Sequence, residues 1–170
     1  FDQADFSNFA TSATTRERFF NVVLHEMAHV MGFGTLWDNN GIYVNNSGEF
    51  LGAEATAAWQ QEFGQNGTPD VELGGGPGTA NGHWNEVDFG AANTGITVTD
   101  PNSPNFNRDL RNELMTGWLN SNPFISDMTV ASFADIGFVR QVAAIPEPSS
   151  VLLMTVGAVG ALGWRRRRGA

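Results

Sequence analysis

The sequence contains no cysteine and no lysine. Without cysteine the chain can form neither a disulfide framework nor a metal site built on thiolates. A metal ion could therefore be held only by histidine, aspartate or glutamate side chains. Histidine is scarce as well, because the chain has only three: His25, His29 and His83.

Positive charge is also scarce. The formal net charge is −9, and four of the nine basic residues form a single run, Arg165 to Arg168. The rest of the chain is therefore more acidic than the total suggests. Because nucleic acid binding requires a basic surface, this composition argues against nucleic acid as a partner. An acidic composition in the part of the chain before the arginine run suits a protein outside the cytoplasm.

Two of the three histidines fall in one predicted helix, from Thr14 to Gly32. Thr14 and Glu17 have the spacing of a capping box, and Gly32 can end the helix in a left-handed conformation. Apolar residues recur at helical spacing and predict a face that packs on a core: Phe20, Val23, Leu24, Met27 and Met31.

Within this helix, His25, Glu26 and His29 form the pattern His-Glu-x-x-His. Four residues make slightly more than one helical turn, so both imidazoles project from one face and can converge on one ion. In this pattern the histidines bind zinc and the glutamate acts on a water molecule as general base. A helix that carries two ordinary histidines is the alternative interpretation.

A second helix is expected at residues 53–63, a segment rich in helix formers. Trp59 and Phe63 lie four residues apart in it and are expected to pack on the core. Glu54 and Glu62 are expected to face solvent.

A third helix is expected from Thr129, as its cap, to Asp135, with Gly137 as its stop. Alternating or β-branched residues predict short strands at three places: residues 42–44, 96–98 and 138–139.

A glycine-rich loop, residues 64–82, leads to His83. It is no phosphate loop, because the required lysine is absent. A loop of this length in a compact domain is typically functional or disordered, and this one could return the last histidine to the helix. A surface histidine beside Trp84 is the alternative. Further along, Met115 lies in an apolar setting.

Four segments, in order, resemble the leishmanolysin-like branch of the metzincin metallopeptidases. HEMAHVMGFGTLW resembles the active-site helix, GGGPGTANGHWNE the approach to the third metal ligand, ELMTG the methionine turn, and MTVASFADIGF the segment that closes the C-terminal subdomain. Together they span about residues 14–140. Gly32 falls where metzincins have glycine, whereas Thr35 stands where their compact signature has its third histidine. The leishmanolysin-like branch has a long insertion before that histidine, which places it here at His83.

This resemblance implies an α+β fold of the metzincin type, with an active-site helix and a loop-rich C-terminal subdomain. It implies the following roles: zinc ligands at His25, His29 and His83, a general base at Glu26, and structural positions near the site at Gly32 and Met115. The implied activity is hydrolysis of peptide bonds in a protein or peptide substrate with Zn²⁺ as cofactor. A non-catalytic zinc-binding surface or extracellular-matrix protein on the same scaffold is the alternative.

Several assignments stay open. Met115 could equally be a core methionine, since a methionine turn is itself a packing element. Glu86 and Glu113 could support the metal ligands from outside or face solvent. Only a short segment precedes His25, so the N-terminal sheet subdomain of the family is expected to be largely missing. The tyrosine that some metzincins carry after the turn methionine has no counterpart, because Tyr43 is the only tyrosine.

The C-terminal residues 146–170 differ in character from residues 1–145, the expected catalytic domain. Pro-Glu-Pro is followed by an uncharged run, residues 151–164, that is short against the roughly 20 residues of a spanning helix, and then by four arginines. These parts in this order resemble the PEP-CTERM sorting signal. The resemblance implies export to the bacterial cell surface or beyond, transient anchoring in the inner membrane, and processing by an exosortase. An unprocessed membrane anchor is the alternative.

Overall fold

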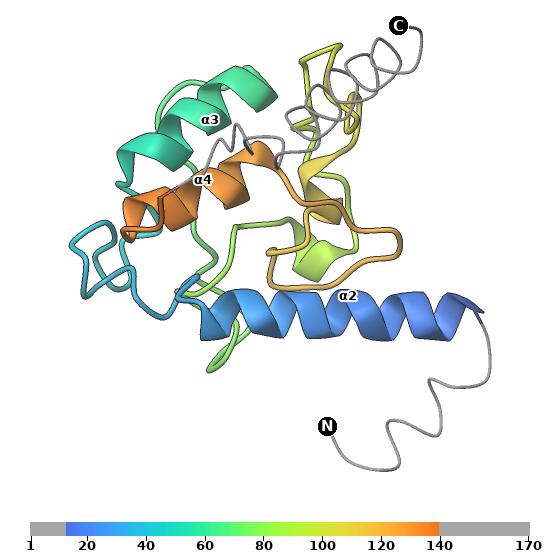
Figure 1. The fold of residues 1–170 in the computed structure, drawn as a ribbon, viewed down its shortest axis with the longest axis horizontal. Helices are drawn as coiled ribbons and strands as arrows, with labels where there is room; N and C mark the ends of the chain where they lie inside the picture. Colours follow the sequence, from blue (N-terminus) through green and yellow to red (C-terminus); the bar gives the residue numbers. More distant parts are fainter. Residues whose placement is uncertain (1–12, 140–170) are drawn as a thin grey trace, which may run out of the picture. The chain divides into compact units, whose positions relative to one another are not determined.

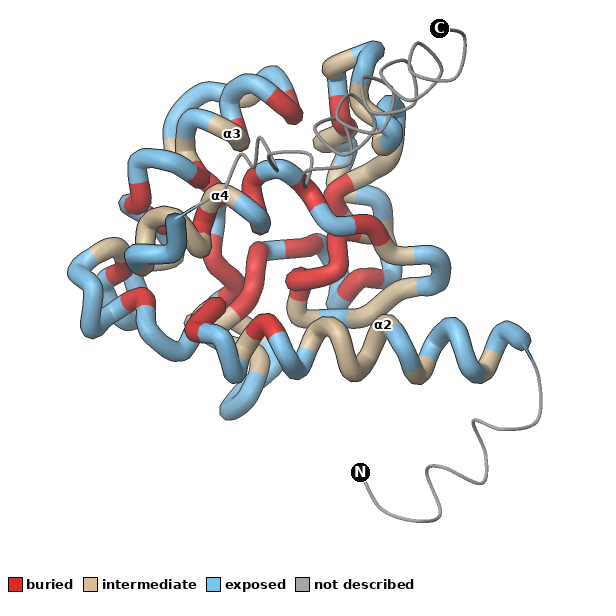
Figure 2. Tube along the Cα trace, viewed as in Figure 1, coloured by how far each residue is buried: buried red, intermediate tan, exposed pale blue. Residues whose placement is uncertain are grey.

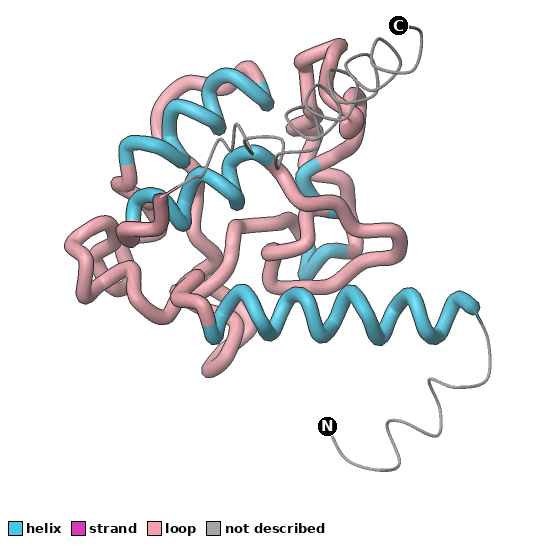
Figure 3. Tube along the Cα trace, in the orientation of Figure 1, coloured by secondary structure: helices cyan, strands magenta, loops and turns pink. Residues whose placement is uncertain are grey.

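The computed structural model describes residues 13–139, in which loops are more extensive than helices (Figure 3). The regular elements of this part are α2 (Ala13–Val30), α3 (Ala53–Phe63), η1 (Asp88–Gly90), η2 (Leu110–Asn112) and α4 (Asp127–Asp135). The chain divides into two units, Phe1–Val139 and Arg140–Ala170, and only the first contains described residues. The predicted tail, residues 146–170 with its apolar run 151–164, lies outside them. Within residues 13–139, no helix combines the length and the hydrophobicity needed to cross a membrane.

The three α-helices predicted from the sequence are all present, and α3 has the predicted bounds. α2 begins at Ala13, so Thr14 lies inside its first turn and not at the cap. α4 begins two residues before Thr129, because Ser126 is its cap: the Ser126 hydroxyl accepts a hydrogen bond from the Thr129 N–H at 3.0 Å. The predicted cap was wrong because both residues carry a hydroxyl suited to capping.

Residues 13–139 contain no β-strand, and their β-pairing is confined to isolated bridges. Two of the predicted strands contribute one bridge each: Tyr43 with Phe50, and Thr97 with Asp109. Residues 138–139 form neither a strand nor a bridge. Turns at Gly41 and Gly48, with φ of 68° and 78°, confine the segment between them to a single pair. The strand predictions are therefore wrong in length, although two of them mark places where the backbone pairs.

Aromatic rings form the centre of the core, and the buried stretches gather between α2 and the pair α3 and α4 (Figure 2). Trp84 stacks on Trp37 at a centroid distance of 5.1 Å. It meets the rings of Phe33 and Phe50 edge-on, each at 5.2 Å. Because Trp84 directly follows His83, this packing fixes the chain at the place where the third histidine emerges.

α3 packs against α4 (Figure 1). Trp59 and Phe63 are buried, as predicted. The prediction that Glu62 faces solvent is wrong, because its side chain is only 4% exposed and its Oε2 accepts a hydrogen bond from the Met128 N–H at 3.2 Å. The free N–H groups in the first turn of α4 attract this carboxylate into the interior.

Most of the predicted apolar face of α2 points away from the core. Three residues predicted to pack there are largely solvent-exposed: Phe20 (64%), Met27 (53%) and Met31 (45%). Ala28 is buried and Leu24 packs partly against the core, so the inward side of the helix is the one that carries His25 and His29. The prediction is confirmed for Leu24 and wrong for the three exposed residues, because it took hydrophobicity as the guide to the buried face, whereas this helix turns two polar side chains inward.

Candidate metal centre

His25 and His29 lie one turn apart on α2. Their rings meet edge-on at a centroid distance of 4.8 Å, and their Nε2 atoms are 3.1 Å apart. Both side chains are half-buried. The helix alone therefore supplies two nitrogens aimed at one point, as the spacing of the two residues predicts.

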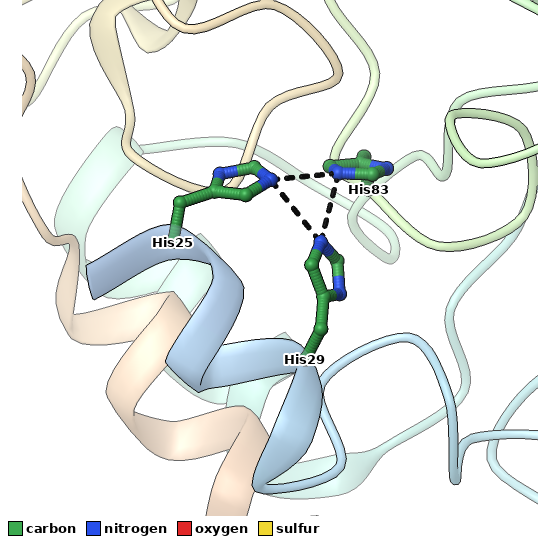
Figure 4. Close-up of side chains that lie close together, drawn as sticks. All are labelled: His25, His29 and His83. Atoms are coloured by element: carbon green, nitrogen blue, oxygen red, sulfur yellow. Dashed lines mark hydrogen bonds between the residues drawn. The ribbon is translucent and has the colours of Figure 1, made fainter. Parts of the chain in front are cut away.

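His83 brings a third nitrogen to the same point (Figure 4). Its Nε2 lies 3.0 Å from the Nε2 of His25 and 3.0 Å from that of His29. The preceding residue, Gly82, passes so close to Gly34 that a Cβ on Gly34 would lie 2.5 Å from the Gly82 carbonyl oxygen. Gly34 also has a φ of 71°, which glycine adopts without a steric penalty. The loop after α2 therefore holds the third histidine against the helix.

Each imidazole is oriented by a backbone carbonyl at its other ring nitrogen. The Nδ1 atoms of His25, His29 and His83 lie 2.7, 2.9 and 2.8 Å from the carbonyl oxygens of Leu114, Phe33 and Thr79, respectively. A carbonyl oxygen can only accept, so each Nδ1 carries a proton and donates it. In a neutral ring the Nε2 then presents a lone pair.

A hydrogen bond cannot join the Nε2 atoms of His25 and His83 when both rings are neutral. Burial lowers the pKa of His25 below its usual range and lowers the pKa of His83 to about 4, so both rings are neutral near pH 7. The Nε2 lone pairs of His25 and His83, 3.0 Å apart with no proton between them, repel each other unless a cation lies beside them. The geometry therefore fits a metal ion with three imidazole ligands.

Zinc suits this donor set. A Zn–N distance of about 2.0–2.1 Å with tetrahedral angles separates the ligand nitrogens by about 3.3–3.4 Å. The observed separations of 3.0–3.1 Å lie within a few tenths of an ångström of that value. Calcium and magnesium take oxygen ligands, whereas imidazole suits zinc, copper, nickel and iron. Three protein ligands leave a position open, as in catalytic zinc sites.

Gly32 makes the turn after α2. Its φ is 116°, and a Cβ there would lie 2.7 Å from Ile136 Cδ1 and 2.8 Å from Leu36 Cδ1, so glycine is the residue that fits. Thr35, at the position of the third histidine in the compact signature, donates its hydroxyl hydrogen to the His29 carbonyl at 3.0 Å. Thr35 thus secures the end of the helix.

Met115 is fully buried in the core. Its carbonyl accepts a hydrogen bond from the Trp84 N–H at 3.0 Å, next to His83. The carbonyl of the preceding residue, Leu114, receives the Nδ1–H of His25. Met115 therefore packs as a core methionine, and its turn also contacts the segments that supply two of the three nitrogens.

Glu26 is exposed on α2 beside His25. Its carboxylate is close enough to raise the pKa of His25 slightly, against the larger lowering caused by burial. An exposed carboxylate next to metal ligands can exchange protons with water, which a general base requires.

Glu86 and Glu113 are buried, with 6% and 1% of their side chains exposed, so the alternative that they face solvent is wrong. Glu86 Oε2 accepts a hydrogen bond from the Gly117 N–H at 3.0 Å, and burial raises the pKa of Glu86 to about 7. Glu113 Oε2 accepts from the Met115 N–H at 2.5 Å. Both carboxylates therefore bind the turn that contains Met115.

The sequence did not reveal the groups that orient the imidazoles. These groups are the backbone carbonyls of Phe33, Thr79 and Leu114, and no side-chain pattern marks a carbonyl because every residue has one. Gly34 carried a readable signal, since glycine often marks a close approach of two backbones. Its partner, Gly82, is identified only by the fold.

Residues 144–168 match the PEP-CTERM protein-sorting motif, in agreement with the predicted tail at 146–170. This motif marks the protein for export and for transient membrane anchoring through its C-terminal tail before processing by an exosortase. No curated protein and no solved structure matches the chain.

Proposed function

We propose that this exported protein is a zinc endopeptidase on a metzincin-like α+β scaffold of the leishmanolysin type. The observation that supports it most strongly is the convergence of three histidine Nε2 lone pairs from two distant segments of the chain. Glu26 beside His25 adds the acid–base group that peptide hydrolysis requires. The order of the four resembling segments supports the assignment to this branch.

His25, His29 and His83 would hold the ion through Nε2. Bound zinc supplies Lewis-acid chemistry, which activates water and polarises a peptide carbonyl. The carbonyl partners at Nδ1 keep each ring in the tautomer that binds metal and make each Nε2 more basic. Because burial lowers the pKa of His83 to about 4, a proton competes weakly for this nitrogen at neutral pH.

Glu26 would then move the proton that hydrolysis requires. Its carboxylate removes a proton from the attacking water, and the same group delivers that proton to the nitrogen of the departing amine. Glu26 is exposed, so both water and an extended peptide can reach it. The resemblance to leishmanolysin-like peptidases supports a polypeptide, cleaved at an internal bond, as the substrate.

The test is metal analysis together with Glu26→Gln. Purified protein should hold one zinc ion per chain, and Glu26→Gln should retain it while proteolysis falls by about two to four orders of magnitude. Glu54→Gln, which changes an exposed glutamate on α3, is the matched control and should cleave as the wild type does.

Two outcomes would contradict the proposal. Full activity in Glu26→Gln would remove the glutamate from the mechanism. Tight zinc binding without cleavage of any protein substrate would favour the alternative, a non-catalytic zinc-binding protein at the cell surface or in the extracellular matrix.

A further inference from the structure

Residues 113–116 form a turn that is bonded to two of the three metal-ligand segments. The Leu114 carbonyl receives the Nδ1–H of His25 at 2.7 Å, and the Met115 carbonyl receives the N–H of Trp84, the neighbour of His83, at 3.0 Å. We call this segment the ligand turn. A displacement of the ligand turn would move both of these hydrogen bonds together. A group that holds the ligand turn in place therefore also holds the segments that supply His25 and His83.

Glu113 is one such group, and the Phe124 carbonyl, which accepts from the Leu114 N–H at 2.7 Å, is another. The Glu113 side chain is 1% exposed and both of its oxygens accept hydrogen bonds. Oε2 accepts from the Met115 N–H at 2.5 Å, inside the ligand turn. Oε1 accepts from the Ser126 N–H at 3.0 Å, from the Ser126 hydroxyl at 2.9 Å and from the Thr129 hydroxyl at 2.6 Å, at the start of α4.

The two hydroxyl groups already accept other hydrogen bonds. Ser126 Oγ accepts from the Thr129 N–H at 3.0 Å, and Thr129 Oγ1 accepts from the Trp84 indole N–H at 2.8 Å. Their own hydrogens are thereby directed to Glu113. Burial raises the pKa of Glu113, and the four hydrogen bonds act in the opposite direction. Whether the Glu113 carboxyl is protonated or ionised, each of its oxygens faces one backbone N–H group whose direction is fixed by the chain.

We propose that Glu113 is a positioning residue for the metal centre. It ties the ligand turn to the first turn of α4, and through the Leu114 and Met115 carbonyls it sets the direction of His25 and the path of the chain at His83. This inference rests on the proposed zinc site. It extends that site to a buried carboxylate that touches no imidazole.

Glu113→Gln tests the proposal because it preserves shape and changes one acceptor into a donor. Three donors surround Oε1, so the glutamine oxygen will occupy that place and its NH2 group will face the Met115 N–H. Two donors then oppose each other inside the ligand turn, while the contacts to α4 are kept. The perturbation therefore falls on the metal-site end of the network.

Glu62→Gln is the matched control. Glu62 is also a buried glutamate near the start of α4; its Oε2 accepts a hydrogen bond from the Met128 N–H, Asp127 is a second backbone partner of the carboxylate, and its Oε1 has no partner. A glutamine can keep that bond and turn its NH2 group to the free side. This variant removes a buried carboxylate without disturbing the ligand turn.

The experiment measures zinc affinity by competition with a chelator at pH 8, together with the visible spectrum of the Co²⁺-substituted protein. Glu113→Gln should bind zinc about 10- to 100-fold more weakly than the wild type and show an altered cobalt spectrum, as expected when the support of a ligand is lost. Glu62→Gln should match the wild type in both. If Glu113→Gln does not fold, Glu113→Asp replaces it, because the shorter side chain cannot reach both ends of the network and should show the same loss.

Wild-type affinity and spectrum in the Glu113 variant would overturn the inference. An equal loss in the Glu113 and Glu62 variants would overturn it as well, because the effect would then come from the removed charge. Failure of the wild type to bind zinc would instead refute the proposed function itself, together with everything that rests on it.

Discussion

Replacing Gly34 by alanine should lower zinc affinity by more than the accompanying loss of folding stability would explain. The new Cβ would lie 2.5 Å from the Gly82 carbonyl oxygen and 2.7 Å from Gly82 Cα. Because ordinary van der Waals contacts begin near 3.4 Å, one of the two backbones must move by about 0.5–1 Å. His83 follows Gly82 and Phe33, whose carbonyl orients His29, precedes Gly34, so a shift of either backbone moves one of the three imidazoles.

The expected loss follows from the tolerance of zinc coordination. Metal–ligand distances hold to within about 0.2 Å, which is smaller than the movement that Gly34→Ala requires. Zinc affinity should therefore fall about 10- to 100-fold, the range seen when ligand support is lost. The φ of 71° at this position adds about 1–2 kcal/mol of destabilisation, because a Cβ meets the following carbonyl in the left-handed region.

Gly41→Ala separates the two effects. Gly41 has a φ of 68°, but a Cβ there would meet nothing within 4 Å. This variant should lose about 1–2 kcal/mol in urea unfolding of the metal-free protein and bind zinc as the wild type does. Chelator competition on both variants decides the question. If Gly34→Ala binds zinc as tightly as Gly41→Ala, the contact between Gly34 and Gly82 does not position His83.

Two further predictions concern stability. Burial raises the pKa of the Glu62 carboxyl from 4.5 to about 7, so the folded state binds the carboxyl proton more tightly than the unfolded chain does. The resulting stabilisation of the folded state is complete below pH 4.5 and is lost as the pH rises through 7. Glu62→Gln cannot ionise, so its unfolding free energy should match the wild type at pH 4.5 and exceed it by about 2–3 kcal/mol at pH 8; a difference independent of pH would contradict this. Ser126→Ala should cost about 1–2 kcal/mol in urea unfolding, because it removes the cap of α4; wild-type stability would show that the cap is unimportant.

The helices and the ligand pair His25 and His29 could be predicted from the sequence because their signals are local, whereas His83 was identified by the family resemblance and as the one remaining histidine. The spacing of His25 and His29 places both imidazoles on one face of any helix, and the composition of residues 53–63 favours a helix whatever surrounds it. The inward face of α2 could not be predicted, because its partners are backbone carbonyls, and the partner of His25, the Leu114 carbonyl, lies far away in the sequence. The burial of Glu62 depends in the same way on where α4 begins, which is a property of the fold.

The site therefore has two kinds of requirement, and the sequence displays only one of them. Imidazole chemistry fixes the residue type at His25, His29 and His83, so these positions can be read directly. Their orientation depends on carbonyls, which tolerate any side chain but demand a particular backbone path. A few residues set that backbone path. Gly34 does so because it has no Cβ, and Glu113 does so because its carboxylate accepts hydrogen bonds from the backbone. A chain that kept all three histidines and lost either residue would retain the motif without the geometry on which the proposed metal site depends.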